Sequence, residues 1–203
     1  MKKLSLGVLV LLAPLASVAE VYEIDGTHSK VGFKVKHLGI SNVIGNFNEF
    51  SGEFKFDPEN IDKSSVEAQI VTKSIDTDVE KRDKHLRGED FFDAPKFPLL
   101  SFKSSGIKDV SGKDFKILGT LTLHGVSKEV ELATTYSGSV KDPWGKERSA
   151  FVAKTKIDRR DYGLTWSKLL ETGGLVVDND VFIELEIEGV KKEASGGEEE
   201  EKK

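Results

Sequence analysis

The sequence of 203 residues contains no cysteine, only one methionine and five prolines, and few polar aromatic residues, with three tyrosines and two tryptophans. Without cysteine a disulfide framework is excluded, so the fold must be held by the burial of apolar side chains, which a chain of this length can supply in one core. A basic excess is also lacking. The formal net charge is -5 at pH 7, which does not favour nucleic acid as a partner.

The common catalytic and cofactor motifs are missing as well. The sequence has no G-x-S-x-G, H-E-x-x-H, phosphate loop, dinucleotide fingerprint or EF-hand loop. Its four histidines, at positions 28, 37, 85 and 124, fall on separate segments, which disfavours a metal site. Ser29 follows His28 directly, but adjacency in sequence is not a catalytic triad, and both residues are expected to hydrogen-bond a strand end. We therefore expect no metal, no cofactor and no recognisable catalytic motif.

A long hydrophobic run occurs only at the beginning of the chain. Lys2 and Lys3 precede an apolar stretch over 4–15, and the small residues Ser17 and Ala19 follow at the spacing of a cleavage site. A membrane anchor is the alternative, but the run is shorter than the roughly 18–20 residues that a span needs. A bacterial lipoprotein requires a cysteine directly after the cleavage site, but this sequence has Glu20 there, so we do not expect the mature chain to be acylated. The pattern predicts a signal peptide over 1–19 and a mature product of charge about −7, not embedded in a membrane, in the bacterial periplasm.

From position 21 to 189 the chain is dominated by apolar residues at every second position. In the last run Val181, Ile183, Leu185 and Ile187 alternate with Phe182, Glu184, Glu186 and Glu188, and similar runs occur near residues 31–35, 50–56, 66–70, 100–102, 130–136 and 151–157. Alternation of this kind is typical of antiparallel strands with one buried face. Turn formers at 57–60, 110–113 and 141–145 separate the runs. The pattern predicts an all-β fold of about eight strands, enough to close into a barrel.

Three departures from this pattern are predicted. Residues 79–87 are good helix formers with Asp76 or Thr77 as a cap and Gly88 as the stop. A second helical turn is expected over 37–44, and residues 178–180 read as a turn before the last strand. The barrel domain is expected to span 20–190, without internal repeats, followed by a disordered acidic tail over 191–203.

The interior of such a barrel is either filled by its own side chains or holds one small ligand. Gly32, Gly45, Gly52 and Gly119 lie within strand patterns, where glycine marks either a corner of the barrel or a place where another group approaches the backbone. Twelve phenylalanines outnumber the tyrosines and tryptophans. Phenylalanine lines an apolar surface without a polar group to satisfy, which favours an apolar ligand over a sugar.

Four collinear segments resemble the YceI-like proteins, a family of periplasmic polyisoprenoid-binding proteins. They are residues 25–33 (DGTHSKVGF) with 35–37 (VKH), residues 85–87 (HLR) with 90–93 (DFFD) and 96–98 (KFP), residues 119–128 (GTLTLHGVSK), and residues 157–164 (IDRRDYGL) with Trp166. The resemblance spans nearly all of 21–189 and excludes the acidic tail. It implies an eight-stranded antiparallel, lipocalin-like barrel whose interior holds a long isoprenoid or related lipid chain.

On this resemblance, apolar lumen residues and polar residues near the mouth form the candidate ligand site. These are His28, Ser29, Phe33, Val35, His37, Phe50, Phe54, Phe102, Leu121, Leu123, His124, Arg160, Asp161 and Trp166. Arg159 is a further head-group candidate, although residues 158–161 can equally form an ion-paired corner.

We favour a function in the periplasm, where the protein would sequester or transport a polyisoprenoid, an isoprenoid quinone or a fatty lipid. Two alternatives stay open: an enzyme acting on such a lipid through His28, His124 and Asp161, and a stress-induced structural protein. A homodimer is compatible with the sequence.

Overall fold

The structure is a computed structural model, which describes residues 19–169 and 174–193. The expected signal peptide therefore lies outside the described residues except for Ala19, and so does most of the expected tail. The strands are β1 (Glu20–Ile24), β2 (Lys30–His37), β3 (Ser41–Phe47), β4 (Phe50–Phe56), β5 (Ser65–Val71), β6 (Ile75–Asp76), β7 (Leu99–Ser111), β8 (Asp114–Leu123), β9 (Val126–Lys141), β10 (Glu147–Asp158) and β11 (Val177–Lys191). The α-helix α1 (Glu80–Leu86) is accompanied by three short 3₁₀ helices, η1 (Ile61–Lys63), η2 (Thr72–Ser74) and η3 (Arg159–Tyr162).

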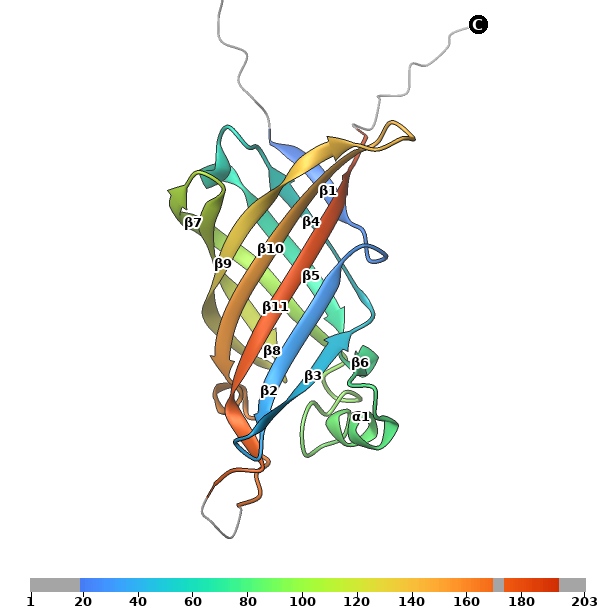
Figure 1. Cartoon of the computed structure of the whole chain (residues 1–203), viewed down its shortest axis with the longest axis vertical. Coiled ribbons are helices and arrows are strands. Elements are labelled where there is room, and N and C mark those ends of the chain that lie inside the picture. The colour runs from blue at the N-terminus through green and yellow to red at the C-terminus, as the bar shows by residue number, and fades with distance from the viewer. Residues whose placement is uncertain (1–18, 170–173, 194–203) are drawn as a thin grey trace, which may run out of the picture.

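Eight of these strands close into an antiparallel barrel (Figure 1). The order around the ring is β1, β4, β5, β7, β8, β9, β10 and β11, and β11 returns to β1 through the pairs Tyr22–Lys191 and Ile24–Gly189. The predicted all-β, eight-stranded barrel is confirmed. Turns join the strands at 57–60, 112–113 and 142–146, close to where the turn formers predicted them.

Strand β11 shows how alternation determines the inside of the barrel. Ile183, Leu185 and Ile187 face the interior, whereas Phe182, Glu184 and Glu186 are exposed. A shift of one residue would bury the two glutamates, so the register predicted from the sequence is strongly favoured.

The remaining strands extend one side of the barrel. β2 pairs with the first half of β11, β3 pairs with β2, and the two-residue strand β6 ends this branch. Helix α1 lies beside β6 (Figure 1) and is tied to it by Arg87, whose guanidinium donates to the carbonyl oxygens of Lys73 and Ile75 at 2.8 and 2.7 Å. The helix therefore lies against β6, at the end of this branch of the sheet.

The predicted helix is present, but its predicted cap is wrong. Val79 is the N-cap residue, and no side chain in the described part of the chain caps the helix. Thr77 instead donates its backbone N–H and its hydroxyl to the buried carboxylate of Asp83, at 3.0 and 2.5 Å. This contact joins α1, through Asp83, to Thr77 in the segment before the helix.

Three local predictions need correction. Residues 37–44 form a β-hairpin instead of a helical turn, because Leu38 and Gly39 adopt positive φ angles of 55° and 75° and reverse the chain between β2 and β3. Residues 178–180 belong to β11, where Asp180 pairs with Asp158 of β10. Lys191 ends β11 and forms ion pairs with Glu20 and Glu147, both at 2.9 Å, so it belongs to the barrel and not to the tail.

No helix among residues 19–169 and 174–193 is both long enough and apolar enough to cross a membrane.

Candidate functional site

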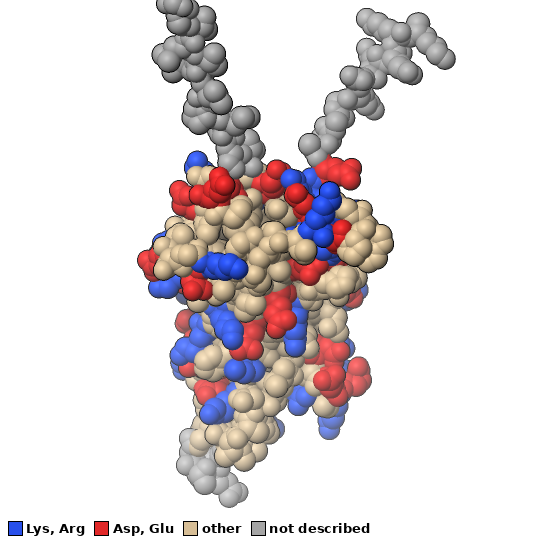
Figure 2. All heavy atoms as spheres, turned by 45° about the horizontal axis from the view of Figure 1, so that its top comes forward, with Lys and Arg blue, Asp and Glu red and all other residues tan. Residues whose placement is uncertain are grey.

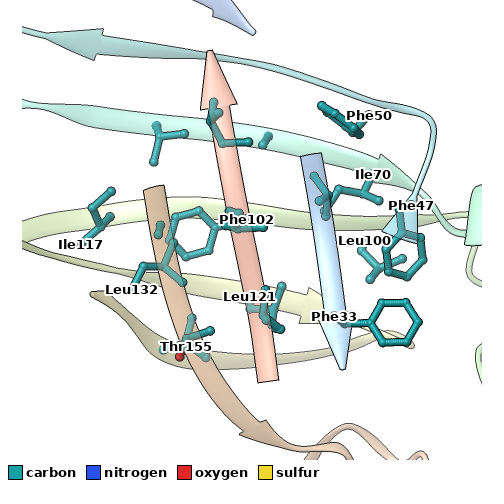
Figure 3. Close-up of a pocket in the computed structure, with 18 of the residues that line it drawn as sticks. Phe33, Phe47, Phe50, Ile70, Leu100, Phe102, Ile117, Leu121, Leu132 and Thr155 are labelled. Atoms are coloured by element: carbon teal, nitrogen blue, oxygen red, sulfur yellow. The ribbon is translucent and has the colours of Figure 1, made fainter. Parts of the chain in front are cut away.

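The barrel encloses a cavity of about 240 Å³ (Figure 3). It is larger than the roughly 150 Å³ engineered apolar cavity that binds benzene. Its wall comes from β1–β5, β7–β11, α1 and the segments beside them. Phe33, Phe47, Phe102, Leu121 and Leu132 point into this space from different strands (Figure 3). The lumen can therefore hold the apolar part of a ligand.

One end of the lumen is closed by rings, which we call the aromatic cluster: Tyr22, Phe54, Phe56, Phe115, Tyr136 and Phe151. Phe151 packs edge-on against Phe54 and Phe56 with centroid separations of 5.2 and 4.8 Å. Such edge-to-face pairs stabilise the barrel beyond the area they bury. This end lies where β11 finishes, so a chain in the lumen would extend away from it.

The other end of the cavity lies at η3, α1 and the segment after α1. Leu86, Phe91 and Phe92 reach the cavity from the helix side, and Leu164 and Val177 reach it from beside η3. Phe92 meets Phe47 edge-on at 5.7 Å, and Phe47 packs on Phe33. Side chains of α1 and the segment after it thus form the part of the cavity wall that the strands do not supply at this end.

Two strand glycines make room for phenylalanine. A Cβ atom on Gly119 would lie 2.5 Å from the ring of Phe102, and one on Gly45 would lie 2.4 Å from the ring of Phe33. Both distances are far below van der Waals contact. These glycines accommodate neighbouring rings of the wall, so the approaching group anticipated in the sequence is the protein's own side chain.

Half of the residues proposed from the sequence line the cavity. They are Phe33, Val35, Phe50, Phe54, Phe102, Leu121 and Leu123. All seven are apolar; five lie in the alternating runs, and Leu121 and Leu123 come from the segment 119–128 that resembles the family. The structure therefore brings the apolar candidates together in one continuous wall.

The other candidates lie away from this wall. Ser29 exchanges hydrogen bonds with the backbone of Glu188, donating at 3.1 Å and accepting at 2.9 Å, as expected for a strand end. His37 ends β2 opposite Ser41, and Asp161 is exposed on η3. Trp166 packs on Phe91 at 5.2 Å. His28 and Arg160 lie in ion pairs, with Asp25 and Asp158 respectively.

The catalytic alternative required His28, His124 and Asp161 to converge. Nδ1 of His28 lies 2.8 Å from Asp25, whereas Nδ1 of His124 lies 3.2 Å from the carbonyl oxygen of Tyr162. No hydrogen bond among the described residues joins any two of the three. The arrangement does not form an acid–base pair.

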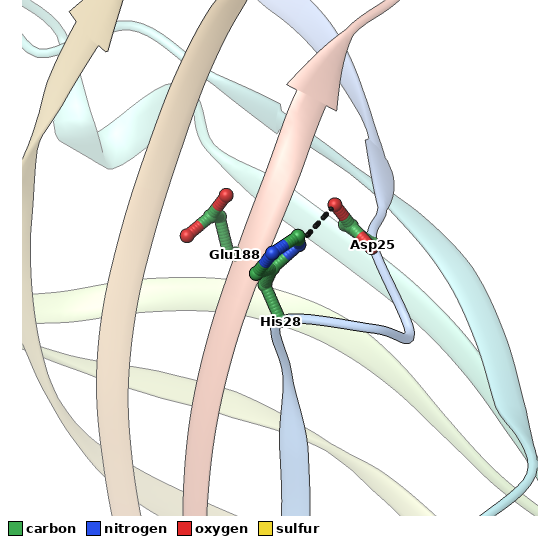
Figure 4. A group of neighbouring side chains, drawn as sticks. All are labelled: Asp25, His28 and Glu188. Carbon is green, nitrogen blue, oxygen red and sulfur yellow. Dashed lines mark hydrogen bonds and ion pairs between the residues drawn. The ribbon is translucent and has the colours of Figure 1, made fainter. Parts of the chain in front are cut away.

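A polar cluster that the sequence did not reveal lies on the outside of the barrel and centres on Arg148. Its guanidinium donates to Asp25 at 2.8 Å, to Asp142 at 2.9 Å and to Glu188 at 2.6 Å. We call these residues with His28 the Arg148 cluster. Asp25, His28 and Glu188 place three possible metal-ligand atoms within 4.8 Å of one another (Figure 4), but the guanidinium already supplies positive charge to both carboxylates.

Within the Arg148 cluster, the pKa values of Asp25 and Arg148 are shifted in opposite directions. Hydrogen bonds from Thr27, Arg148 and His28 hold the pKa of Asp25 well below its usual range. Hydrogen bonds to Asp142, Asp25 and Glu188 raise the pKa of Arg148. Since these residues come from the β1–β2 turn, the β9–β10 turn, β10 and β11, the cluster fastens four segments of the barrel together.

Sequence reasoning also missed a set of lumen residues that follow the same alternation. Leu100, Leu132, Ile157, Ile183 and Leu185 line the cavity. The period-two pattern already marked them as inward and could have found them. Arg159, a head-group candidate from the sequence, also lines the cavity.

Comparison with known proteins agrees with this geometry. The fold and cavity define a small antiparallel barrel built around a ligand-sized apolar space. A family model described as a YceI-like domain matches residues 22–189. A UPF0312 protein of Vibrio cholerae is 39% identical over 185 residues, which cover 90% of this chain and 94% of that protein. The chain belongs to the YceI-like family.

Solved structures show the same architecture. The YceI protein of Campylobacter jejuni is 35% identical, with a TM-score of 0.67 and coverage of 83% of this chain and 96% of that one. A polyisoprenoid-binding domain from Saccharophagus degradans is 18% identical, with a TM-score of 0.61 and coverage of 87% and 100%. At that identity the second likeness shows the fold alone.

Proposed function

We propose that this protein binds one long apolar lipid, a polyisoprenoid, an isoprenoid quinone or a similar chain, inside its barrel. It sequesters or carries that lipid through the bacterial periplasm. The observation that carries the proposal is the cavity wall, which is formed mostly by aliphatic and phenylalanine side chains from nearly every strand. A hydrocarbon chain leaving water gains free energy on such a wall in proportion to the area it buries.

The expected energetics are sufficient for a carrier. Each buried methylene contributes about 0.8 kcal/mol, so an isoprene unit contributes roughly 3–4 kcal/mol before ordering costs. Three or four units contribute roughly 9–16 kcal/mol, from which the cost of association is subtracted, and micromolar affinity requires a net value of about 8 kcal/mol. Prenyl and acyl chains bind equally well to such an apolar surface. The wall therefore indicates that the ligand is a long apolar chain but does not identify which one it is.

The outer surface suits transport through water. Lysine, arginine, aspartate and glutamate are interspersed over the exterior (Figure 2), and no large surface of a single charge sign stands out in that view. The name of the Saccharophagus degradans domain supports a polyisoprenoid as the ligand class. The N-terminal segment supports export to the periplasm.

Protein purified from its native host without detergent is expected to retain a lipid. Mass spectrometry of an organic extract should detect close to one molecule of a long prenyl or acyl compound for each chain. The control is a mock purification from cells that lack the tagged protein. The same chain after delipidation should bind the identified compound again with at least micromolar affinity. An extract that matches the mock, together with failure to bind any prenyl or acyl lipid, would refute the proposal.

A further inference from the structure

Arg159 places a buried positive charge in the wall of a mostly apolar lumen. The residue is only 4% exposed and lines the cavity beside Ile157, Leu164 and Val177. Lys55, the other basic residue of the wall, is exposed on β4. The buried guanidinium therefore marks the η3 end of the cavity as chemically different from the aromatic cluster at the other end.

Within residues 19–169 and 174–193, every hydrogen bond of this guanidinium goes to an uncharged oxygen. Nε donates to the carbonyl oxygen of Asp178 at 2.9 Å, and Nη1 donates to that of Leu164. Nη2 donates to the carbonyl oxygen of Val177 at 3.4 Å and to Oδ1 of Asn179 at 3.2 Å. These bonds leave one N–H of Nη1 without an acceptor among the described residues.

The charge is likewise unpaired. No carboxylate among the described residues lies within ion-pair distance of Arg159, because the nearby Asp158 pairs with Arg160 at 2.5 Å. Burial lowers the pKa of Arg159, while Asp158 and Asp178 act in the opposite direction. A buried charge without a charged partner is costly, and buried charges in proteins are as a rule paired.

We propose that Arg159 binds the polar end of the lipid and selects an anionic oxygen, a phosphate or a carboxylate, for that end. This inference rests on the proposed function. Guanidinium groups suit such oxygens because they combine charge with directed N–H donors. The ligand would then lie with its head at η3 and its tail toward the aromatic cluster.

Arg160 provides the matched control. It follows Arg159 directly, but its side chain is 57% exposed and its guanidinium is bound to Asp158 through both Nε and Nη2. The ion-paired corner considered for residues 158–161 thus exists, and it involves Arg160. A change at this position removes a positive charge nearby without changing the cavity wall.

The test compares lipids that share a chain and differ in the head. Dissociation constants of the delipidated full chain would be measured for farnesyl phosphate against farnesol, and for palmitate against hexadecanol. At least one anionic probe should bind about tenfold or more tightly than its alcohol. Arg159→Gln should reduce that ratio to about twofold or less, whereas Arg160→Gln should preserve it. The pair that shows the preference distinguishes phosphate from carboxylate.

Equal affinities in both pairs for the unmodified protein would overturn the inference, and so would an unchanged ratio in Arg159→Gln. If Arg159→Gln does not fold, Arg159→Lys provides a second test. This variant retains the positive charge and should still bind the anionic lipid more tightly than the alcohol. Equal affinities of the lysine variant for both lipids would contradict a charge-based role. Binding of all four probes with equal strength would refute only the head-group assignment. Binding of none would refute the proposed function.

Discussion

Replacing Ala153 with phenylalanine is expected to weaken lipid binding at least about 100-fold. Ala153 lies on β10, is 6% exposed and lines the cavity, opposite Leu185 of β11 and Thr134 of β9. A ring at this position occupies space that the ligand would use. Displacing four or five ligand carbons from the wall costs about 3–4 kcal/mol, which corresponds to more than two orders of magnitude in affinity.

Val152→Phe is the control for this change. Val152 neighbours Ala153 on the same strand but is absent from the cavity wall, so the added ring should leave affinity within about threefold. Denaturant titration of both variants would show that they remain folded, since overpacking costs about 1–3 kcal/mol. Equal affinities of the two variants would mean that the lipid does not occupy the lumen.

Replacing Arg148 with methionine is expected to lower the midpoint of thermal unfolding by roughly 5–10 °C. The substitution leaves Asp25, Asp142 and Glu188 close together without the guanidinium that pairs with them. Lys154→Met is the control, because Lys154 is exposed and makes a single 3.7 Å ion pair with Glu184. A shift as small as that of the control would show that the Arg148 cluster does not fasten the barrel.

The acid dependence of stability provides a second readout for Arg148→Met. The pKa of Asp25 is lower in the folded protein than in the unfolded chain, so its contribution to stability is full above about pH 4 and is lost as the pH falls through the folded value. Without Arg148 that pKa should move toward its ordinary value. Urea midpoints at pH 7 and pH 3 should therefore differ less in the variant than in the unmodified protein.

Most of the barrel was predictable because alternation and turn chemistry are local properties of the chain. The register of β11 followed directly from three glutamates that had to stay outside. The hairpin at residues 38–40 was not predictable in the same way. Its reversal depends on a left-handed conformation of Leu38, which is uncommon for a leucine and leaves no mark in the hydrophobic pattern.

The polar part of the site was less predictable than the apolar part. Arg159 and Arg160 are adjacent and chemically identical in the sequence, yet one enters the wall and the other faces water. The difference arises where β10 passes into η3. Side chains alternate between the two faces of a strand, but this alternation does not continue into a helix, so it could not show which arginine faces the lumen. The Arg148 cluster joins positions more than a hundred residues apart, which no spacing motif connects.

The most direct test of the account is a crystal structure of the protein carrying the lipid with which it leaves its native host. The account predicts continuous density for the chain inside the barrel, in contact with Phe102, Leu121 and Leu132. Density for the lipid on the outer surface, with the lumen filled by the protein's own side chains, would contradict it.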